Sequence, residues 1–269
     1  LYGHQAAGGP HEENMMSARS TAKLAYYLLK DHPEVLKYTS IEHAKFTKGE
    51  DKPIKMDNWN WMLPGLIYGY KGVDGLKTGH TDKAGYCFTA TAKRGGTRLI
   101  SVVMKTASEA ARFKQTKILL DYGFENFAKT TLLDHGYVPK DKKQLPVTKG
   151  KTDRVGIETS KPIQMVIEKG TKKEYKPKLA IDDSLLTKDG KLTAPVKKGK
   201  QVGTVKMVYT GNDNSYGFLT KAGNTQSVAP VVTTKNVEKA SWFTLTLRSI
   251  GGFFSGVWSG AVNTVKGWL

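Results

Sequence analysis

Apolar positions at helical spacing predict two helices in the first half of the chain. One lies in Ser17–Lys30, and a longer one follows Thr106, with Gly123 as its stop signal. The first is amphipathic, as a helix that packs on a sheet or a core requires. The apolar positions are Leu24, Tyr27, Leu28 and Leu29 in the first helix and Ala110, Phe113, Ile118, Leu119 and Tyr122 in the second.

Between these helices the pattern changes to strands. Val73–Thr81, Ala84–Arg94 and Thr97–Lys105 have β character, and Gly95-Gly96 is a two-residue hairpin signal between the last two. The polar stretch from Lys45 to Asn60 predicts irregular structure. We therefore expect part of an antiparallel sheet with helices packed against it.

From about Thr131 onward, short apolar segments alternate with Lys-Gly, Asp-Gly and Pro turns. Regularly spaced short strands with such turn signals are typical of a small β-sandwich. The predicted strands include Arg154–Glu158, Ile163–Ile167, Tyr175–Ile181 and Gln201–Tyr209.

The segment from Trp242 to Leu269 has aromatic and aliphatic residues at steps of three and four, and its charges are Arg248 and Lys266. Its polar fraction and repeated Gly are wrong for a spanning helix, which needs about 20 mainly apolar residues. An amphipathic helix in the membrane interface fits better; the alternatives are a helix docked on a protein core and a coiled-coil partner. The expected anchor residues are Trp242, Phe243, Leu247, Ile250, Phe253, Phe254, Val257, Trp258 and Trp268.

Length and charge agree with three parts: an α+β part, a β-rich part and the amphipathic helix. The 269 residues hold a formal charge of +18, divided as +6 over 1–130, +9 over 131–238 and +3 over 239–269. The lysines of the middle part are interleaved with acids and turn residues, which favours solvated strand faces over a nucleic-acid site. Because the chain opens at Leu1 in a Gly-rich loop, we expect it to be a piece of a longer protein.

One Cys and six His exclude a disulfide scaffold and a Cys-based zinc cluster. The His residues show no paired ligand spacing, so we expect no metal and no cofactor. Cys87 stands in the middle of a predicted strand, and we expect a small packed residue there rather than a reactive thiolate.

The sharpest motif is Lys77-Thr78-Gly79, which ends a predicted strand and precedes a hairpin and a long helix. Lys77 offers a cation for a substrate carboxylate, Thr78 offers a hydroxyl at that charged end, and Gly79 leaves room for an extended peptide beside the strand. Period-2 alternation puts Lys77 and Thr78 on opposite faces, so both serve one site only in a cleft at the strand's edge. The alternative is an ordinary edge strand with a solvated Lys and a turn Gly.

The run DGLKTGHTDKAGYCFTATAKRGGTRLISVVMKT, from Asp74 to Thr106, resembles the corresponding segment of serine D-alanyl-D-alanine carboxypeptidases, the low-molecular-mass penicillin-binding proteins. The similarity extends to Asn58-x-Asn60, to LTAPVKKGKQVG at 192–203 and to WFTLTLRSIGGFF at 242–254, which is similar to the membrane anchor of these enzymes. The resemblance implies the C-terminal part of a serine transpeptidase/β-lactamase-like domain in 1–130, a β-rich domain in 131–238 and an anchor helix in 239–269.

In this family a Ser in S-x-x-K attacks the carbonyl of a terminal D-Ala-D-Ala, with the Lys as its base, and water releases the shortened peptide. Carried over residue by residue, the resemblance implies catalytic roles for Lys77, Thr78 and Gly79. It implies substrate contacts for Lys77, Thr78, His80, Thr81 and Arg112. Arg112 stands where the family has an Arg that holds the substrate's terminal carboxylate, a role that suits a guanidinium; the alternative is an exposed helix Arg.

This sequence departs from the family's pattern at two motifs. No S-x-N tripeptide occurs in the 269 residues, and the one S-x-x-K, Ser20 to Lys23, lies only 57 positions before Lys77. It falls in the helix that resembles the family's segment after S-x-N. We therefore expect Ser20 to cap a helix N-terminus rather than to act as the nucleophile, and this chain alone to be inactive.

The resemblance thus implies a D-Ala-D-Ala carboxypeptidase that trims peptidoglycan stem peptides and binds β-lactams. We expect it on the extracytoplasmic face of the cell membrane, attached through the C-terminal helix, with no nucleic-acid partner. Two other functions stay open: a β-lactamase-type serine hydrolase, which shares the KTG motif, and a non-enzymatic basic protein that binds membrane surfaces. The β-rich part and the amphipathic tail argue against the β-lactamase, because they give a hydrolase of small soluble drugs no evident benefit.

Overall fold

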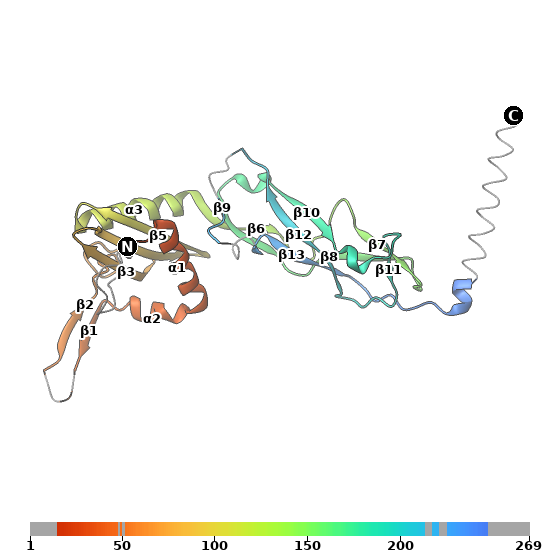
Figure 1. The fold of residues 1–269 in the computed structure, drawn as a ribbon, viewed down its shortest axis with the longest axis horizontal. Helices are drawn as coiled ribbons and strands as arrows, with labels where there is room; N and C mark the ends of the chain where they lie inside the picture. The colour runs from red at the N-terminus through yellow and green to blue at the C-terminus, as the bar shows by residue number, and fades with distance from the viewer. Residues whose placement is uncertain (1–14, 48, 50–51, 213–216, 221–224, 247–269) are drawn as a thin grey trace. The chain divides into compact units, whose positions relative to one another are not determined.

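The computed structural model describes residues 15–47, 49, 52–212, 217–220 and 225–246. The chain divides into two compact units (Figure 1). Unit 1 comprises residues 1–130, 165–173 and 211–224, and unit 2 comprises 131–164, 174–210 and 225–269. Unit 1 holds an antiparallel sheet with helices and unit 2 consists mainly of strands, so the predicted α+β class is confirmed.

Unit 1 is built on a three-stranded antiparallel sheet in the order β3-β4-β5. β3 (Val73–Thr81), β4 (Gly85–Arg94) and β5 (Thr97–Thr106) match the predicted strands to within one residue at each end. Gly95, with a φ of +55°, lies in the turn between β4 and β5, a backbone angle that glycine adopts without strain. The predicted hairpin is therefore confirmed.

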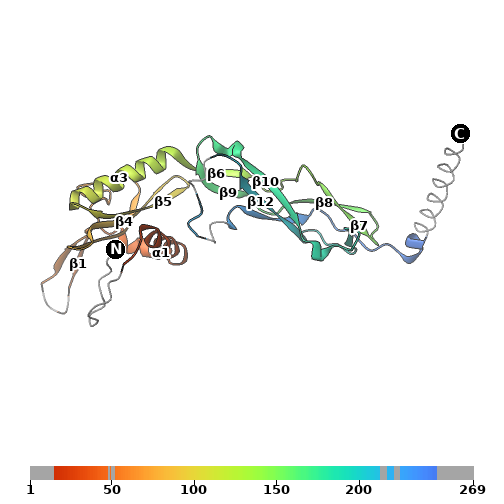
Figure 2. The same cartoon turned by 45° about the horizontal axis from the view of Figure 1, so that its top comes forward.

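Two helices lie on this sheet. Figure 2 shows α3 (Glu109–Asn126) along one face of the sheet and α1 (Ala18–Asp31) on the other side. α1 is followed by a short 3₁₀ turn, η1 (Pro33–Val35), and by α2 (Leu36–Thr39). Both long helices occur where they were predicted, but most of the apolar positions that predicted them are exposed: Leu24 and Tyr27 in α1, and Ile118, Leu119 and Tyr122 in α3.

Gly123 does not end α3, which continues to Asn126; the predicted stop signal is wrong. A Cβ atom at Gly123 would lie 2.5 Å from Cδ1 of Leu99 on β5. Glycine here lets the helix approach the sheet closely, so its presence reflects packing rather than the end of a helix.

The stretch from Lys45 to Asn60 is not irregular as predicted, because it contains most of a hairpin. β1 (His43–Phe46) and β2 (Ile54–Asp57) pair antiparallel, from His43 opposite Asp57 to Phe46 opposite Ile54. Nearly all of these residues are exposed. With no buried face, the hairpin is under no pressure to alternate clearly between apolar and polar residues, and the pattern gave no strand signal.

The core of unit 1 lies between the sheet and α3. Phe88 of β4 packs edge-on against Phe113 of α3, with ring centroids 5.5 Å apart. Phe113 also stacks on Tyr68 and Trp61, at 5.1 and 5.9 Å. The main buried members of this cluster are Met62, Leu63, Tyr70, Val73, Phe88, Ala90, Ala92, Phe113 and Leu120.

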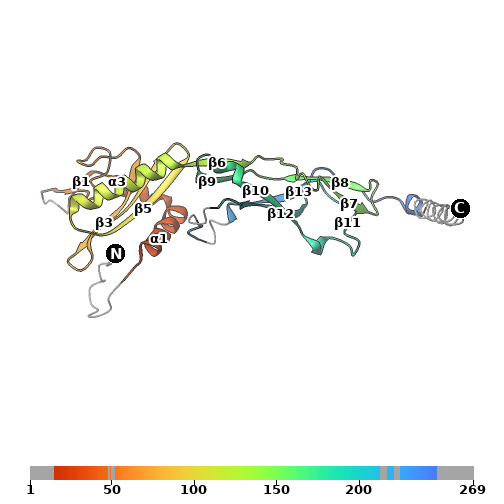
Figure 3. The same ribbon diagram turned by 90° about the horizontal axis from the view of Figure 1, so that it is seen from above.

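The β-rich character predicted for the chain from about Thr131 onward is confirmed (Figure 3). A six-stranded sheet has the order β10-β12-β13-β8-β7-β11, and β6 pairs with β9 in a second, two-stranded sheet. Two short 3₁₀ turns, η2 (Thr171–Glu174) and η3 (Asp183–Leu185), flank β10. The strands are β6 (Phe127–Leu133), β7 (Gln144–Thr148), β8 (Arg154–Thr159), β9 (Ile163–Glu168), β10 (Tyr175–Ile181), β11 (Leu192–Thr193), β12 (Gln201–Tyr209) and β13 (Val228–Thr233).

The inner face of the six-stranded sheet follows a period of two. Val155 and Ile157 on β8, and Ala229 and Val231 on β13, are fully buried, while the residues between them are less so. This alternation is expected of strands with one packed face. At the sheet's edges stand β10, which contains the exposed Pro177, and the two-residue β11.

Residues 242–246 are helical, with Trp242 78% and Phe243 59% exposed. The other predicted anchor residues, Leu247, Ile250, Phe253, Phe254, Val257, Trp258 and Trp268, lie outside the described residues. Within the described ranges, no helix combines the length and the hydropathy that a membrane crossing requires.

Candidate active site

The KTG motif lies on β3, an edge strand of its sheet among the described residues. Lys77 is exposed and Thr78 is buried at 6% exposure, so the two side chains lie on opposite faces, as the alternation predicted. The Lys77 Nζ atom donates a hydrogen bond to the carbonyl oxygen of Thr78 at 2.7 Å. The ammonium group is therefore held along its own strand, beside the edge where an extended peptide can add.

An ion pair fixes the start of β3. Arg98 of β5 reaches across β4 and donates from Nη1 and Nη2 to the two carboxylate oxygens of Asp74, each at 2.8 Å. Arg98 Nη1 also donates to Oγ1 of Thr91 on β4, at 2.9 Å. A bidentate guanidinium–carboxylate pair has a defined geometry, so it sets the position of β3 just before the KTG motif.

Tyr86 is the contact point between two of the predicted site residues. Tyr86 lies opposite His80 in the β3–β4 register, and their ring centroids are 4.0 Å apart. The guanidinium carbon of Arg112, on α3, lies 5.7 Å from the centroid of the same Tyr86 ring. The sequence placed Tyr86 on its strand but gave it no role. What could have indicated a role is that Tyr86 is an aromatic residue near the start of the strand that pairs with the KTG strand.

Arg112 is not an exposed helix residue, so that alternative is wrong. It is 2% exposed, and its Nη2 atom lies 2.5 Å from Oε1 of Glu109, one helical turn earlier. Its guanidinium also lies 4.7 Å from the ring centroid of Phe113. Burial lowers the pKa of Arg112, and the charge of Glu109 opposes this shift. The Nε atom of Arg112 is buried and has no hydrogen-bond partner among the described atoms.

Two residues near the motif have structural contacts. Thr81 Oγ1 accepts a hydrogen bond from the backbone N–H of Ala84 at 3.1 Å, in the turn between β3 and β4. Cys87 is 2% exposed, and its Sγ atom donates to the carbonyl oxygen of Ala84 at 3.4 Å. The prediction that Cys87 is a small packed residue is confirmed.

Ser20 lies in the first turn of α1 and is exposed, but it is not the capping residue that the sequence predicted. The N-cap is Ser17, whose Oγ accepts the backbone N–H of Ser20 at 3.1 Å and lies 3.0 Å from the Ser20 hydroxyl. Lys23 is also exposed. By residue type alone, either Ser17 or Ser20 could be the N-cap of this helix; in the structure it is Ser17.

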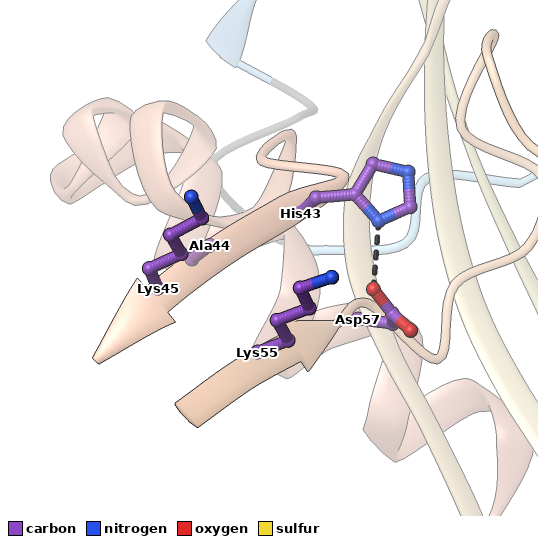
Figure 4. Close-up of a pocket in the computed structure, with 5 residues that line it drawn as sticks. All are labelled: His43, Ala44, Lys45, Lys55 and Asp57. Atoms are coloured by element: carbon purple, nitrogen blue, oxygen red, sulfur yellow. Dashed lines mark hydrogen bonds and ion pairs between the residues drawn. The ribbon is translucent and has the colours of Figure 1, made fainter. Parts of the chain in front are cut away.

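A pocket of about 480 Å³ is lined by residues of the β1–β2 hairpin (Figure 4). Its lining includes the pair of His43 Nδ1 and Asp57 Oδ1, 2.7 Å apart, and none of the KTG residues. Among the described residues, no group of three or more His, Cys, Asp or Glu side chains is placed to hold a metal ion. The hairpin pocket is thus separate from the β3 site; its lining residues are His43, Ala44, Lys45, Lys55 and Asp57.

Comparison with known proteins gives two family matches. Residues 4–108 match the D-alanyl-D-alanine carboxypeptidase family, and residues 127–239 match the C-terminal domain of penicillin-binding protein 5. Among curated proteins, the chain is 30% identical over 245 residues to the D-alanyl-D-alanine carboxypeptidase DacF of Bacillus subtilis. It is 32% identical over 195 residues to DacA of Escherichia coli.

Solved structures show the same relationship. The chain matches penicillin-binding protein 5 of Haemophilus influenzae with a TM-score of 0.56 and 29% identity, covering 83% of this chain and 57% of that one. It matches PBP3 of Streptococcus pneumoniae with a TM-score of 0.61 and 28% identity, covering 86% and 60%.

The matches cover most of this chain but only part of each relative. The chain aligns over 91% of its own length with DacF and 72% with DacA, but over 56% and 44% of theirs, so it spans about half the length of these relatives. The two family matches follow one another along the chain in the order of its two largest sheets, and the KTG strand lies inside the first. The chain therefore belongs to the D-alanyl-D-alanine carboxypeptidase family, the low-molecular-mass penicillin-binding proteins.

Proposed function

We propose that this protein is a serine-type D-alanyl-D-alanine carboxypeptidase that removes the terminal D-Ala from peptidoglycan pentapeptides. The observation that carries the proposal is the position of Lys77-Thr78-Gly79 on an edge strand, with His80 and Arg112 meeting at Tyr86. An edge strand can accept an extended peptide by main-chain hydrogen bonds, and the cations beside it suit a peptide that ends in a carboxylate.

The roles divide among the site residues by their chemistry. The Lys77 ammonium supplies a positive charge at the strand's edge, and Thr78 supplies a hydroxyl close to it. Gly79 has no side chain to obstruct a peptide lying alongside β3. His80, Thr81 and Arg112 border the end of the strand toward which the terminal carboxylate would point.

The nucleophile has no candidate of equal quality in these 269 residues. They contain no S-x-N motif. The serine of the S-x-x-K sequence, Ser20, is exposed in the first turn of α1 and is hydrogen-bonded to the N-cap Ser17. We therefore propose that the 269 residues alone are not acylated by β-lactams, and that acylation requires a serine outside them.

The partners follow from the same chemistry. We propose that the site takes peptidoglycan stem peptides ending in D-Ala-D-Ala and β-lactam antibiotics, and that nucleic acid is not a partner. The names of the relatives support this, since they are called carboxypeptidases and penicillin-binding proteins. No cofactor enters this reaction, because the acyl-enzyme forms from a side chain and breaks with water.

The proposed parts are the C-terminal portion of the peptidase domain in 1–130, the β-rich domain in 131–238 and a membrane-anchor helix in 239–269. The exposed Trp242 and Phe243 support an apolar face at the start of that helix. We propose that it lies in the extracytoplasmic surface of the cell membrane. Flotation with anionic vesicles tests this: binding should be lost when residues 242–269 are deleted, and binding that survives the deletion would overturn it.

Covalent labelling with a fluorescent penicillin tests the activity. Protein expressed from its complete coding sequence should be labelled and should release D-Ala from a D-Ala-D-Ala peptide, while the 269-residue chain should remain unlabelled. Labelling of the 269-residue chain would assign the nucleophile to Ser20, and Ser20→Ala would then abolish it. Fast turnover of penicillin would favour the β-lactamase instead.

A further inference from the structure

Glu109 already binds the guanidinium group of Arg112, which the proposed function assigns to the terminal carboxylate of the substrate. Its side-chain carboxylate contacts Nη2 of Arg112 at 2.5 Å, and the carboxylate is the same chemical group as the C-terminus of a D-Ala-D-Ala peptide. Arg112 is covered at the same time, with only 2% of its surface exposed. In this arrangement a substrate carboxylate cannot reach Arg112 without first replacing Glu109.

The guanidinium group is held in this closed position without full hydrogen bonding. It lies against the rings of Tyr86 and Phe113, at 5.7 and 4.7 Å from their centroids, and its Nε atom is buried with no partner among the described atoms. A buried donor without a partner disfavours the closed state, so a ligand that supplies more acceptor oxygens can compete with it. Two oxygens of a terminal carboxylate can accept two N–H groups, where Glu109 uses one oxygen.

Glu109 is also well placed to release Arg112. It is the first residue of α3, directly after the N-cap Ser108, and its side chain is 30% exposed. The N-terminus of a helix carries a partial positive charge, which stabilises a carboxylate that has lost its cation. Exchange therefore needs only side-chain rotation, while α3 itself stays in place.

We propose that Glu109 is a positioning residue that holds Arg112 closed and that the terminal carboxylate of the substrate displaces it on binding. This rests on the proposed carboxypeptidase function and deepens it. A peptide that ends in a free carboxylate opens Arg112, and the same peptide ending in a neutral carboxamide does not. Glu109 therefore lowers the affinity for the free C-terminus and leaves the binding of the carboxamide unchanged.

A purely structural role for the pair makes a different prediction. Glu–Arg pairs three residues apart are common on helices and add a little stability. If the pair served only the helix, replacing Glu109 would change unfolding slightly and would change the binding of both peptides equally or not at all.

The test uses protein expressed from its complete coding sequence, with the variants Glu109→Gln and Glu109→Asp. Glu125→Gln, an exposed Glu in the last turn of the same helix, is the matched control. The KM for a peptide ending in D-Ala-D-Ala carboxylate should fall about 3–10-fold in both Glu109 variants, with kcat unchanged, because more of the protein is in the open state. The inhibition constant of the matching carboxamide should stay the same, as should both values in the control.

Glu109→Asp separates the contact from its charge, because it keeps the negative charge and shortens the side chain. A lower KM in Glu109→Gln with a wild-type KM in Glu109→Asp would mean long-range repulsion and would overturn the proposal. Equal changes for carboxylate and carboxamide, or no change in either variant, would overturn it as well. If the wild-type protein releases no D-Ala and takes no penicillin label, the proposed function itself fails and the exchange falls with it.

Discussion

The two main sheets of this molecule treat their edge strands in opposite ways. In unit 1, β3 presents Lys77-Thr78-Gly79 at an edge that contains no proline. In unit 2, β10 carries the exposed Pro177 between Lys176 and Lys178, and the opposite edge strand, β11, has only two residues. Proline, lysine and short strands are ordinary means of preventing an edge from pairing with another chain.

On the proposed function, the difference separates an edge on β3 that binds a peptide from an edge on β10 that is protected against pairing. Lys178 lies directly opposite Lys206 in the β10–β12 register, so cations crowd that edge as well as proline. On β3 the single exposed lysine is followed by a buried threonine and then by a glycine. Charge alone therefore does not distinguish the two edges; proline and strand length do.

The largest expected effect comes from removing the cation of the open edge. Lys77→Ala should lower kcat/KM for D-Ala release by about 100-fold or more, because a charge directed at the reacting substrate is lost. Steady-state kinetics on protein from the complete coding sequence would measure it. The exposed Lys93→Ala on β4 is the control, and equal losses in the two variants would contradict a specific role for Lys77.

The next effect concerns the ion pair that positions β3. Arg98→Ala should lower the free energy of unfolding of unit 1 by about 2 kcal/mol, because three hydrogen bonds to Asp74 and Thr91 are lost from a partly buried site. Lys151→Ala, in an exposed pair with Glu238, should cost much less, because solvent screens the pair. Urea titrations of both variants compare the pairs, and similar losses would argue against a special role for the β3 pair.

Alkaline pH should affect unit 1 through Tyr70. Burial, and then a hydrogen bond donated to Asp121 at 2.8 Å, raise the pKa of Tyr70 from 10.0 to about 12. The folded state holds this proton more tightly than the unfolded state, so the stabilisation is present below pH 10 and is lost as the pH rises toward 12.

The loss should be on the order of 2 kcal/mol across that range, and Tyr70→Phe should remove this part of the pH dependence. Urea unfolding followed by circular dichroism at several alkaline pH values would measure it. A variant that keeps the wild-type slope would show that other groups, such as the lysines, cause the decline.

The smallest effect on stability is expected at the protected edge. Pro177→Val restores a backbone donor on β10 and should change the free energy of unfolding by about 0.5 kcal/mol or less, since the residue is exposed. Self-association should nevertheless increase at high protein concentration and high salt, where the positive charge is screened. Light scattering measures this, and an unchanged mass would show that the lysines suffice to protect the edge.

The positions of the strands and long helices in unit 1 were predictable from the sequence, through the β-rich segments, the Gly-Gly turn and the helical spacing of apolar residues. The buried face of α3 was not, because Ile118, Leu119 and Tyr122 are exposed while Arg112 and Thr116 are buried. The β1–β2 hairpin was missed because nearly all of its residues are exposed. Gly123 was misread because a glycine that ends a helix and a glycine that permits close packing look alike in one sequence.

The candidate site was predictable only in part, for a similar reason. The KTG motif is contiguous, so its residues could be named directly. The meeting of His80 and Arg112 at Tyr86 depends on strand register and on the packing of α3, and the burial of Arg112 against Glu109 depends on where the helix lies. Spacing along the chain contains none of this information.

The closeness of α3 to the sheet at Gly123 has a mechanical consequence for the other end of the helix. A helix behaves as a rod, and Arg112 lies 11 residues from Gly123, or about 16 Å along the axis. A Cβ atom at 123 would press on the tip of the Leu99 side chain, so either Leu99 must rotate or α3 must move away from β5. If the helix moves, the displacement is carried toward Arg112, because both residues lie on the same helix.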